Sequence, residues 1–202
     1  MRALFTTLGE DLATIVTRDP SVHSRAEALL HPALPALWAH RLAHGLSRRR
    51  HRGLARLVAY LARALTGIEI HPGARMGRRV FIDHGVGVVI GETAQVGDDV
   101  TIFHQVTLGA VGWWRDASRA PGERRHPCIG DRVVLGAGAT VLGPVTVGDD
   151  ALVGATSLVL YDVPAGARVR AAPAAVTVRD PSPGHCEPAV EALRALASSG
   201  CW

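Results

Sequence analysis

The most regular pattern in the sequence is an apolar residue at every sixth position through the middle of the chain. The series breaks once and then resumes. An α-helix repeats near 3.6 residues and a lone strand near 2, so a period of six suits neither. We expect each unit to supply one short strand and one turn, with three units forming a triangular coil and the apolar side chains stacked inside it. The positions are Ile70, Met76, Ile82, Val88, Ala94, Val100 and Val106, then Ile129, Leu135, Val141, Val147, Val153 and Val159.

Glycine often follows the repeat residue directly, as at Gly77, Gly130, Gly136, Gly148 and Gly154. A glycine permits turn angles that a Cβ atom opposes. The pattern is a hexapeptide repeat, and it predicts a β-helical domain over residues 67–178.

The repeat is interrupted between Val106 and Ile129, where 23 residues stand in place of six. The seventeen surplus residues cannot lie in the wall of the coil. We expect an extruded loop over residues 109–127, which contains the Trp113-Trp114 pair. A loop this long in a compact domain is often a lid or a binding loop.

The segments on either side of the repeat have other patterns. Apolar residues recur at spacings of three and four over residues 2–17 and about 24–65, which predicts an α-helical N-terminal region, residues 1–66. A Pro-rich linker near residue 180 starts a C-terminal tail, residues 179–202, in which a short helix is expected over 188–198.

Composition narrows the chemistry. Hydrophobic residues make up 48% of the 202 residues and the net charge is +4, which excludes a mainly disordered chain. All 22 basic residues are Arg, so a Lys Schiff base is excluded. The Arg48–Arg52 run is interpreted as a solvated helix end, because no nucleic-acid motif accompanies it.

The cysteines and the N-terminal segment add two expectations. The three cysteines have neither metal nor redox spacing, so no metal site is predicted. The first residues lack a long apolar run, so neither a signal peptide nor a membrane span is expected. We therefore expect a cytoplasmic protein.

Four short stretches carry reactive side chains: Asp19-Pro20, Glu69-Ile70-His71-Pro72, Asp83-His84-Gly85 and Arg125-His126-Pro127. With them the chain reads "DPSVHS", "TGIEIHPGARMGRRVFIDHGVGVVIGETAQVGDDV", "VTLG", "RHP" and "VLGAGATVLGPVTVG". Over roughly residues 10–178 this text resembles the serine O-acetyltransferase family. The "IDHG…VVIGET" and "RHP" combination is more specific than the hexads, which many acyltransferases share.

The resemblance implies a left-handed parallel β-helix, usually assembled as a homotrimer. It implies transfer of an acetyl group from acetyl-CoA to the hydroxyl of L-serine, giving O-acetyl-L-serine for cysteine biosynthesis. Long family members pair two trimers through a larger helical region, so a trimer is favoured here and a hexamer is left open. The chain ends in Cys201-Trp202 where family members insert Ile into cysteine synthase, so that complex is not expected.

The resemblance also implies roles for individual residues. His84 matches the catalytic base, which suits an imidazole titrating near neutral pH. Glu69 matches its acidic partner. Asp19 and Asp83 match the acids that hold the substrate ammonium group. The competing interpretation of Asp19 is a helix cap.

The remaining matched residues contact the carboxylate or the co-substrate. Arg125 and His126 match the groups that hold the substrate carboxylate, although Arg124 could serve instead of Arg125. Backbone amides near Gly109 and Ala110 are candidates for holding the cofactor or the oxyanion. Ala137 and Ala155 match positions that line the coenzyme A groove.

Departures from the family leave alternatives open. The loop "GAVGWWRDASRAPGERRHP" is longer than usual and could reshape the acceptor pocket. A different hydroxy amino acid or a specialised-metabolite acceptor is therefore the alternative substrate. Two other classes are weighed: a zinc carbonic anhydrase, which needs a His-x₄-His pair that the repeat lacks, and an inactive scaffold.

Overall fold

The computed structural model describes residues 2–112, 114, 118–120 and 122–172. The chain divides into two compact units, residues 1–171 and 172–202, and the description below concerns the first. Trp113 and the helix expected over residues 188–198 lie outside the described residues.

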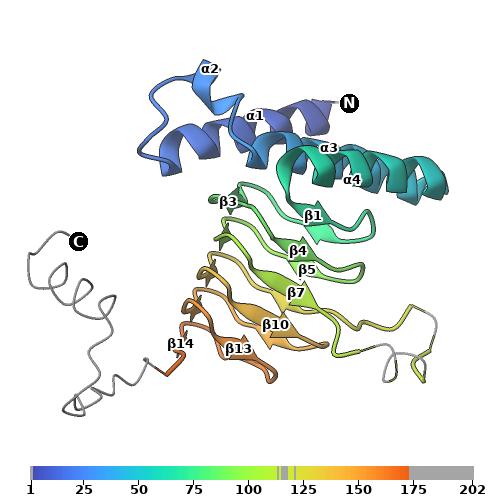
Figure 1. The fold of residues 1–202 in the computed structure, drawn as a ribbon, viewed down its shortest axis with the longest axis vertical. Coiled ribbons are helices and arrows are strands. Elements are labelled where there is room, and N and C mark those ends of the chain that lie inside the picture. The colour runs from blue at the N-terminus through green and yellow to red at the C-terminus, as the bar shows by residue number, and fades with distance from the viewer. Residues whose placement is uncertain (1, 113, 115–117, 121, 173–202) are drawn as a thin grey trace, which may run out of the picture. The chain divides into compact units, whose positions relative to one another are not determined.

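Helices form the N-terminal region, as the spacing of apolar residues predicts (Figure 1). Ser24 caps the second helix by accepting the Glu27 N–H at 3.2 Å, and Gly67 ends the fourth in the left-handed conformation. None of the described helices is long and apolar enough to cross a membrane. The helices are α1 (Arg2–Arg18), α2 (Arg25–Ala28), α3 (Ala33–Arg48) and α4 (Arg52–Thr66).

Short parallel strands follow and form three sheets, called here faces A, B and C. Face A contains β1 (Glu69–Ile70), β4 (Val89–Ile90), β7 (Thr107–Gly109), β10 (Thr140–Leu142) and β13 (Leu158–Val159). Face B contains β2 (Arg75–Met76), β5 (Gln95–Val96), β8 (Cys128–Ile129) and β11 (Thr146–Val147). Face C contains β3 (Phe81–Ile82), β6 (Thr101–Ile102), β9 (Val134–Leu135), β12 (Leu152–Val153) and β14 (Arg168–Val169).

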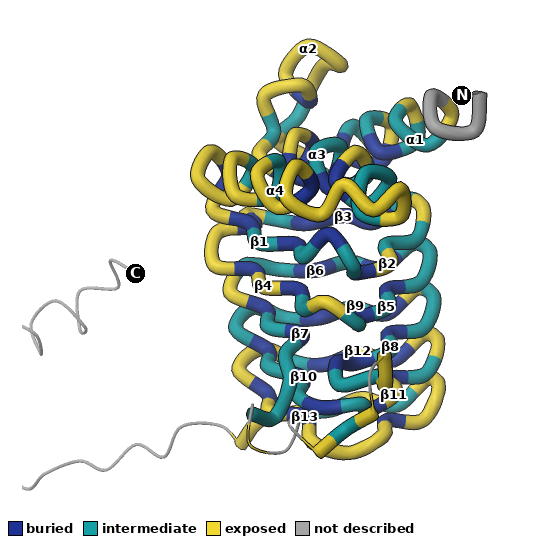
Figure 2. The backbone as a smooth tube through the Cα atoms, turned by 90° about the vertical axis from the view of Figure 1, so that its right-hand side faces the viewer, coloured by how far each residue is buried: buried dark blue, intermediate teal, exposed yellow. Residues whose placement is uncertain are grey.

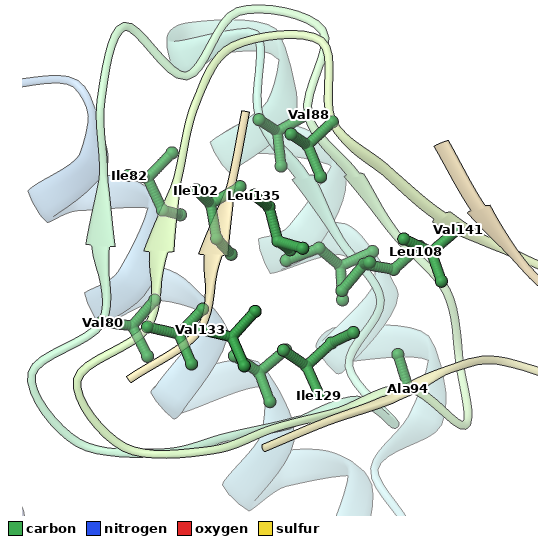
Figure 3. Close-up of a cluster of buried hydrophobic side chains, with 14 of the residues drawn as sticks. Val80, Ile82, Val88, Ala94, Ile102, Leu108, Ile129, Val133, Leu135 and Val141 are labelled. Atoms are coloured by element: carbon green, nitrogen blue, oxygen red, sulfur yellow. The ribbon is translucent and has the colours of Figure 1, made fainter. Parts of the chain in front are cut away.

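From β1 to β13, successive strands lie on faces A, B and C in turn, so the chain winds as a three-sided coil. This confirms the predicted coil of parallel strands. The interior is a column of aliphatic side chains, in which Ile82 is paired with Ile102, and Ile102 with Leu135 (Figure 3). Along each coil, buried positions alternate with intermediate or exposed ones (Figure 2). Burial of each large aliphatic side chain contributes about 1.5–3 kcal/mol.

The predicted stacking register was wrong in the second coil. Ile70 pairs with Ile90 and Ile82 with Ile102, so the first coil has twenty residues, not eighteen. The residues predicted to stack there lie two positions earlier, at the corners, and are also buried: Val88, Ala94, Val100 and Val106. These corner residues also recur every six positions and are also apolar. The sequence pattern alone therefore does not distinguish them from the wall residues.

The surplus residues therefore divide between two corners. The step from Ile82 to Ile90 is eight residues, which is two too many, and the step from Leu108 to Ile129 is 21, which is fifteen too many. Gly109 belongs to β7, so the loop spans residues 110–127 and not 109–127.

Three edges join the faces, and each is defined by its corner residues. The C–A edge consists of residues 83–88, 103–106, 136–139 and 154–157; the A–B edge of 71–74, 91–94, 110–127, 143–145 and 160–162; the B–C edge of 77–80, 97–100, 130–133, 148–151 and 164–167. On the B–C edge Asp98 accepts the Arg78 N–H (2.8 Å), Asp131 that of Asp98 (2.7 Å) and Asp149 that of Asp131 (2.9 Å).

The helical region packs on the β1 end of the coil. Phe81 of β3 contacts a cluster with Ile15, Ala28 and Leu34, and Leu37 of α3 joins the main core. This packing brings the segment after α1 close to the corner that follows β3.

Candidate active site

His84 lies in the widened corner of the C–A edge. At the regular corners of the C–A and B–C edges, the third residue after the inward aliphatic takes the left-handed conformation, as Gln105 does after Ile102 (φ 59°). With two residues more, the left-handed positions are His84 (φ 54°) and Gly87 (φ 77°). A left-handed residue with a side chain costs roughly 1–2 kcal/mol, and such strain is concentrated at functional sites. The imidazole stands out, 80% exposed.

A tight turn fixes this corner. The Val86 N–H donates to the carbonyl oxygen of His84, and the Gly87 N–H donates to that of Gly67 at 3.0 Å. Gly85 sits directly over the side chain of Ile68, where a Cβ atom would clash. The small residue therefore allows the corner to close while His84 projects outward.

Two of the predicted acids lie with His84. Asp83 Oδ1 is 3.7 Å from His84 Nε2. The Oδ1 atom of Asp19 accepts hydrogen bonds from the Ser21 N–H (2.9 Å) and hydroxyl (2.7 Å). These hydrogen bonds, and then the nearby His31 and His84, lower the pKa of Asp19. Asp19 does not cap α2, because Ser24 does. The structure thus brings Asp19, Asp83 and His84 into one cluster.

His31 is a member of this cluster that the sequence analysis missed. Its Nε2 is 3.6 Å from Asp19 Oδ2, and its ring lies 6.1 Å from that of Phe81. Its Nδ1 accepts the Ala33 N–H at 3.2 Å, so in the neutral ring the proton is on Nε2 and faces Asp19. Burial lowers the pKa of His31 despite the opposing charges of Asp19 and Asp83. The sequence signal that could have indicated this residue is the His31-Pro32 pair. His71-Pro72 is a second such pair, and there too Nδ1 accepts the N–H two residues on, that of Gly73.

Glu69 points outward from β1, away from the buried Ile70. Its carboxylate forms an ion pair with Arg63 of α4 at 2.9 Å. It lines a cavity of about 270 Å³ with Tyr60, Arg63 and His71. The structure therefore shows Glu69 paired with an arginine and not with His84, and its role beside the base stays a prediction.

Arg125 and Arg124 differ sharply at the base of the loop. The Arg124 guanidinium donates to the carbonyl oxygens of Pro144 (2.6 Å) and Val145 (3.2 Å) on the next A–B corner. The Arg125 guanidinium instead pairs with Glu92 at 2.6 Å. Arg124 thus anchors the loop, which favours Arg125 as the residue that holds a carboxylate.

Glu92 and His126 complete this part of the A–B edge. Burial works to raise the pKa of Glu92, but the hydrogen bond from Arg125 and neighbouring positive charges keep the pKa below its usual value. His126 is 7% exposed, and its Nδ1 lies 2.9 Å from the Thr93 hydroxyl. A cavity of about 510 Å³ opens beside them, lined by Arg75, Glu92, Arg119 and Arg125 among others.

The predicted site residues thus occupy two edges of the coil. Ala137 and Ala155 lie on the C–A edge with His84, where the Thr156 N–H donates to the Ala137 carbonyl at 2.8 Å. Gly109 and Ala110 lie where face A meets the A–B edge, on the side of Arg125 and His126. Within one chain, face A separates the two groups. Among the described residues, no three His, Cys, Asp or Glu side chains cluster in a way that could hold a metal ion.

Comparison with known proteins identifies the family of the chain. No family model matches the chain. It is 49% identical to the serine acetyltransferase of Helicobacter pylori strain J99 over 174 residues, 86% of this chain and 98% of that protein. The chain belongs to the serine acetyltransferase family. A Mycobacterium tuberculosis serine acetyltransferase is 49% identical over 183 residues, covering 90% of this chain and 77% of that protein.

Solved serine acetyltransferases share the fold. The Neisseria gonorrhoeae enzyme, crystallised with serine, has a TM-score of 0.77 and 35% identity over 87% of this chain and 70% of its own. The Brucella abortus enzyme, crystallised with coenzyme A, has a TM-score of 0.77 and 35% identity over 85% of this chain and 66% of its own. As a serine acetyltransferase family member, the chain is an acyltransferase.

Proposed function

We propose that the chain transfers the acetyl group of acetyl-CoA to the hydroxyl of L-serine, giving O-acetyl-L-serine for cysteine biosynthesis. The observation that carries the proposal is the cluster of Asp19, Asp83 and an exposed His84 at one corner. It offers a base beside two carboxylates, which is what a hydroxy amino acid with a free ammonium group requires.

The chemistry begins at His84. Its imidazole takes the proton of the serine hydroxyl while Asp19 and Asp83 bind the ammonium group. The serine oxygen attacks the thioester carbonyl and forms a tetrahedral oxyanion. Collapse of this intermediate breaks the C–S bond, and the imidazolium returns its proton to the sulfur, which leaves as free coenzyme A.

The co-substrate has a candidate groove along the C–A edge. Beyond His84, the corners of this edge carry the small residues Ala137 and Ala155. They would let a pantetheine arm lie against the backbone. Gly109 and Ala110, across face A, would offer backbone amides from the other side. In this proposal the Glu69 carboxylate gives up its ion pair with Arg63 and then stabilises the His84 imidazolium.

We infer that a complete site needs two chains. His84 and Arg125 lie on different edges, so the A–B edge of a neighbouring copy would supply Arg125 and His126 to the C–A edge of the first. A homotrimer of left-handed parallel β-helices meets this requirement three times. A hexamer stays open, a cysteine synthase complex is not expected, and we expect the protein in the cytoplasm.

The activity test measures coenzyme A thiol release from acetyl-CoA with L-serine, D-serine, homoserine and threonine. L-serine should give the highest kcat/KM, and His84→Ala should lower it roughly 10²–10⁴-fold. His51→Ala, an exposed histidine just before α4, is the matched control and should stay within about threefold. A higher kcat/KM with another acceptor would favour the alternative substrate, for which the fifteen surplus loop residues are the specific reason.

A further inference from the structure

Thr93 stands at the centre of the contacts that hold Arg125 and His126. Its hydroxyl oxygen accepts the backbone N–H groups of Arg125 (3.0 Å) and His126 (3.1 Å). The same hydroxyl lies 2.9 Å from His126 Nδ1, and the Thr93 backbone N–H lies 3.2 Å from that nitrogen. One side chain from the previous coil therefore ties down two residues that are more than thirty positions away in the sequence.

The protons in this network can be assigned by counting donors. The Thr93 oxygen already accepts two N–H groups, so its own proton is free to be donated to Nδ1. The Thr93 N–H can only donate. Nδ1 of His126 therefore faces two donors and cannot carry a proton itself without losing both hydrogen bonds. The ring is held neutral, with its proton on Nε2.

The residues on either side of Thr93 complete the support. Gly91 lies against the Cδ2–Nε2 edge of the His126 ring, and a Cβ atom there would overlap it. Glu92 pairs with the Arg125 guanidinium at 2.6 Å. Each residue of the Gly91-Glu92-Thr93 triplet thus contacts the Arg125-His126 pair: Gly91 by packing, Glu92 by an ion pair and Thr93 by hydrogen bonds.

We propose that Thr93 is a positioning residue for the acetyl transfer, and that it sets His126 as a hydrogen-bond donor through Nε2. In this form His126 donates to an anionic group of the amino-acid substrate and does not act as a base, which leaves His84 as the proton acceptor. The part that concerns catalysis rests on the proposed function; the tautomer does not.

The tautomer is tested first, on the full chain with ¹⁵N-labelled histidine. The NMR spectrum should show His126 with an unprotonated Nδ1 and a protonated Nε2, assigned by the loss of its signals in His126→Gln. In Thr93→Val the Nδ1 tautomer should become populated, whereas Thr93→Ser should keep the wild-type signals. A proton on Nδ1 in the wild-type protein overturns the proposal, whatever the enzyme's activity.

Kinetics provide the second test. Thr93→Val leaves two backbone N–H groups without their acceptor, so kcat/KM for L-serine should fall about 10–100-fold. The KM for acetyl-CoA should change less than about twofold, and Thr93→Ser should recover most of the loss. Thr140→Val, a half-buried strand threonine of face A, is the control.

The outcomes separate the two proposals. If Thr93→Val keeps the wild-type KM and kcat for serine, or if Thr93→Ser is as impaired as Thr93→Val, the positioning role is wrong. If the wild-type protein releases no thiol with any acceptor but shows the Nε2 tautomer, the proposed function fails and the assignment of the His126 proton stands.

Discussion

The C–A and A–B edges both depart from the regular coil, but in opposite ways. The C–A edge gains two residues, and they push His84 out on a left-handed backbone until it is 80% exposed. The A–B edge gains fifteen, yet His126 at the end of that loop is 7% exposed and hydrogen bonded to Thr93. The two-residue insertion exposes a reactive side chain. The fifteen-residue insertion instead needs side chains from neighbouring coils to hold the C-terminal end of the loop in place.

This difference suggests what each edge contributes. A base must reach its substrate, so exposure is useful to His84 even at the cost of backbone strain. A group that fixes the orientation of the substrate must not move. Arg124 and Thr93 therefore anchor the end of the loop that carries Arg125 and His126. The predictions below test this division, beginning with the largest effect.

Mixing two inactive variants tests whether the two edges belong to one site. His84→Ala and Arg125→Ala should each lose most activity. Unfolded together in equal amounts and refolded, they should regain about a quarter of the wild-type rate, because random assembly leaves that share of sites with both residues intact. Each variant refolded alone is the control. A mixture no more active than its components would place the complete site within one chain.

Gly91→Ala should disrupt the A–B edge more than any other single methyl group. The new Cβ atom would overlap the His126 ring, so we expect a loss of about 1–3 kcal/mol in the free energy of unfolding, measured by urea denaturation. Gly53→Ala in α4, where a Cβ meets no atom within 4 Å, should instead stabilise by about 0.5–1 kcal/mol. Equal effects from the two changes would contradict close packing at the corner.

Acid should weaken the A–B edge through His40. This buried residue of α3 is hydrogen bonded to Ala74 of the first corner, and burial lowers its pKa from 6.5 to about 3. Because the folded-state pKa is the lower one, the unfolded chain binds the proton first as pH falls. The contribution of the neutral His40 ring to the free energy of unfolding is therefore complete above about pH 6.5 and is lost toward pH 3. About 3 kcal/mol is gone by pH 4.

The His40 contribution is measured as the change in Tm between pH 7 and pH 4. His40→Gln, which keeps a donor for the Ala74 backbone, should flatten this dependence. The exposed His23→Gln is the control and should leave the slope unchanged. A slope that survives in His40→Gln would assign the acid sensitivity to other groups.

The smallest effect is expected at His31 on the C–A edge. His31→Phe removes the Nε2–H that faces Asp19 while keeping a ring against Phe81. The KM for L-serine should rise about threefold to tenfold with little change in kcat, since the polar contact between the Nε2–H and the Asp19 carboxylate, at 3.6 Å, is lost. His23→Phe is the matched control. A fall in kcat without a change in KM would mean that His31 acts on His84 and not on Asp19.

The period of six was enough to predict the coil, because wall positions must be apolar in any three-sided coil of strands. The register of the second coil was not predictable, because Val88 and Ala94 are as apolar as the true wall residues Ile90 and Val96. Only strand pairing reveals the extra residues at His84. The contacts of Thr93 were also hidden: they depend on two corners more than thirty residues apart being stacked. Thr93 is part of the "VVIGET" text that carries the family resemblance, but nothing in the local sequence indicates that its hydroxyl contacts Arg125 and His126.

The B–C edge, where one aspartate after another accepts the N–H of the coil before it, makes the coil modular. Asp98, Asp131 and Asp149 occupy equivalent places, so excising residues 131–148 would join matching ends and shorten the stack by one layer, about 4.8 Å. The groove proposed along the C–A edge therefore changes length in whole layers. A chain that lacks one layer should accept a thioester carrier with a correspondingly shorter arm.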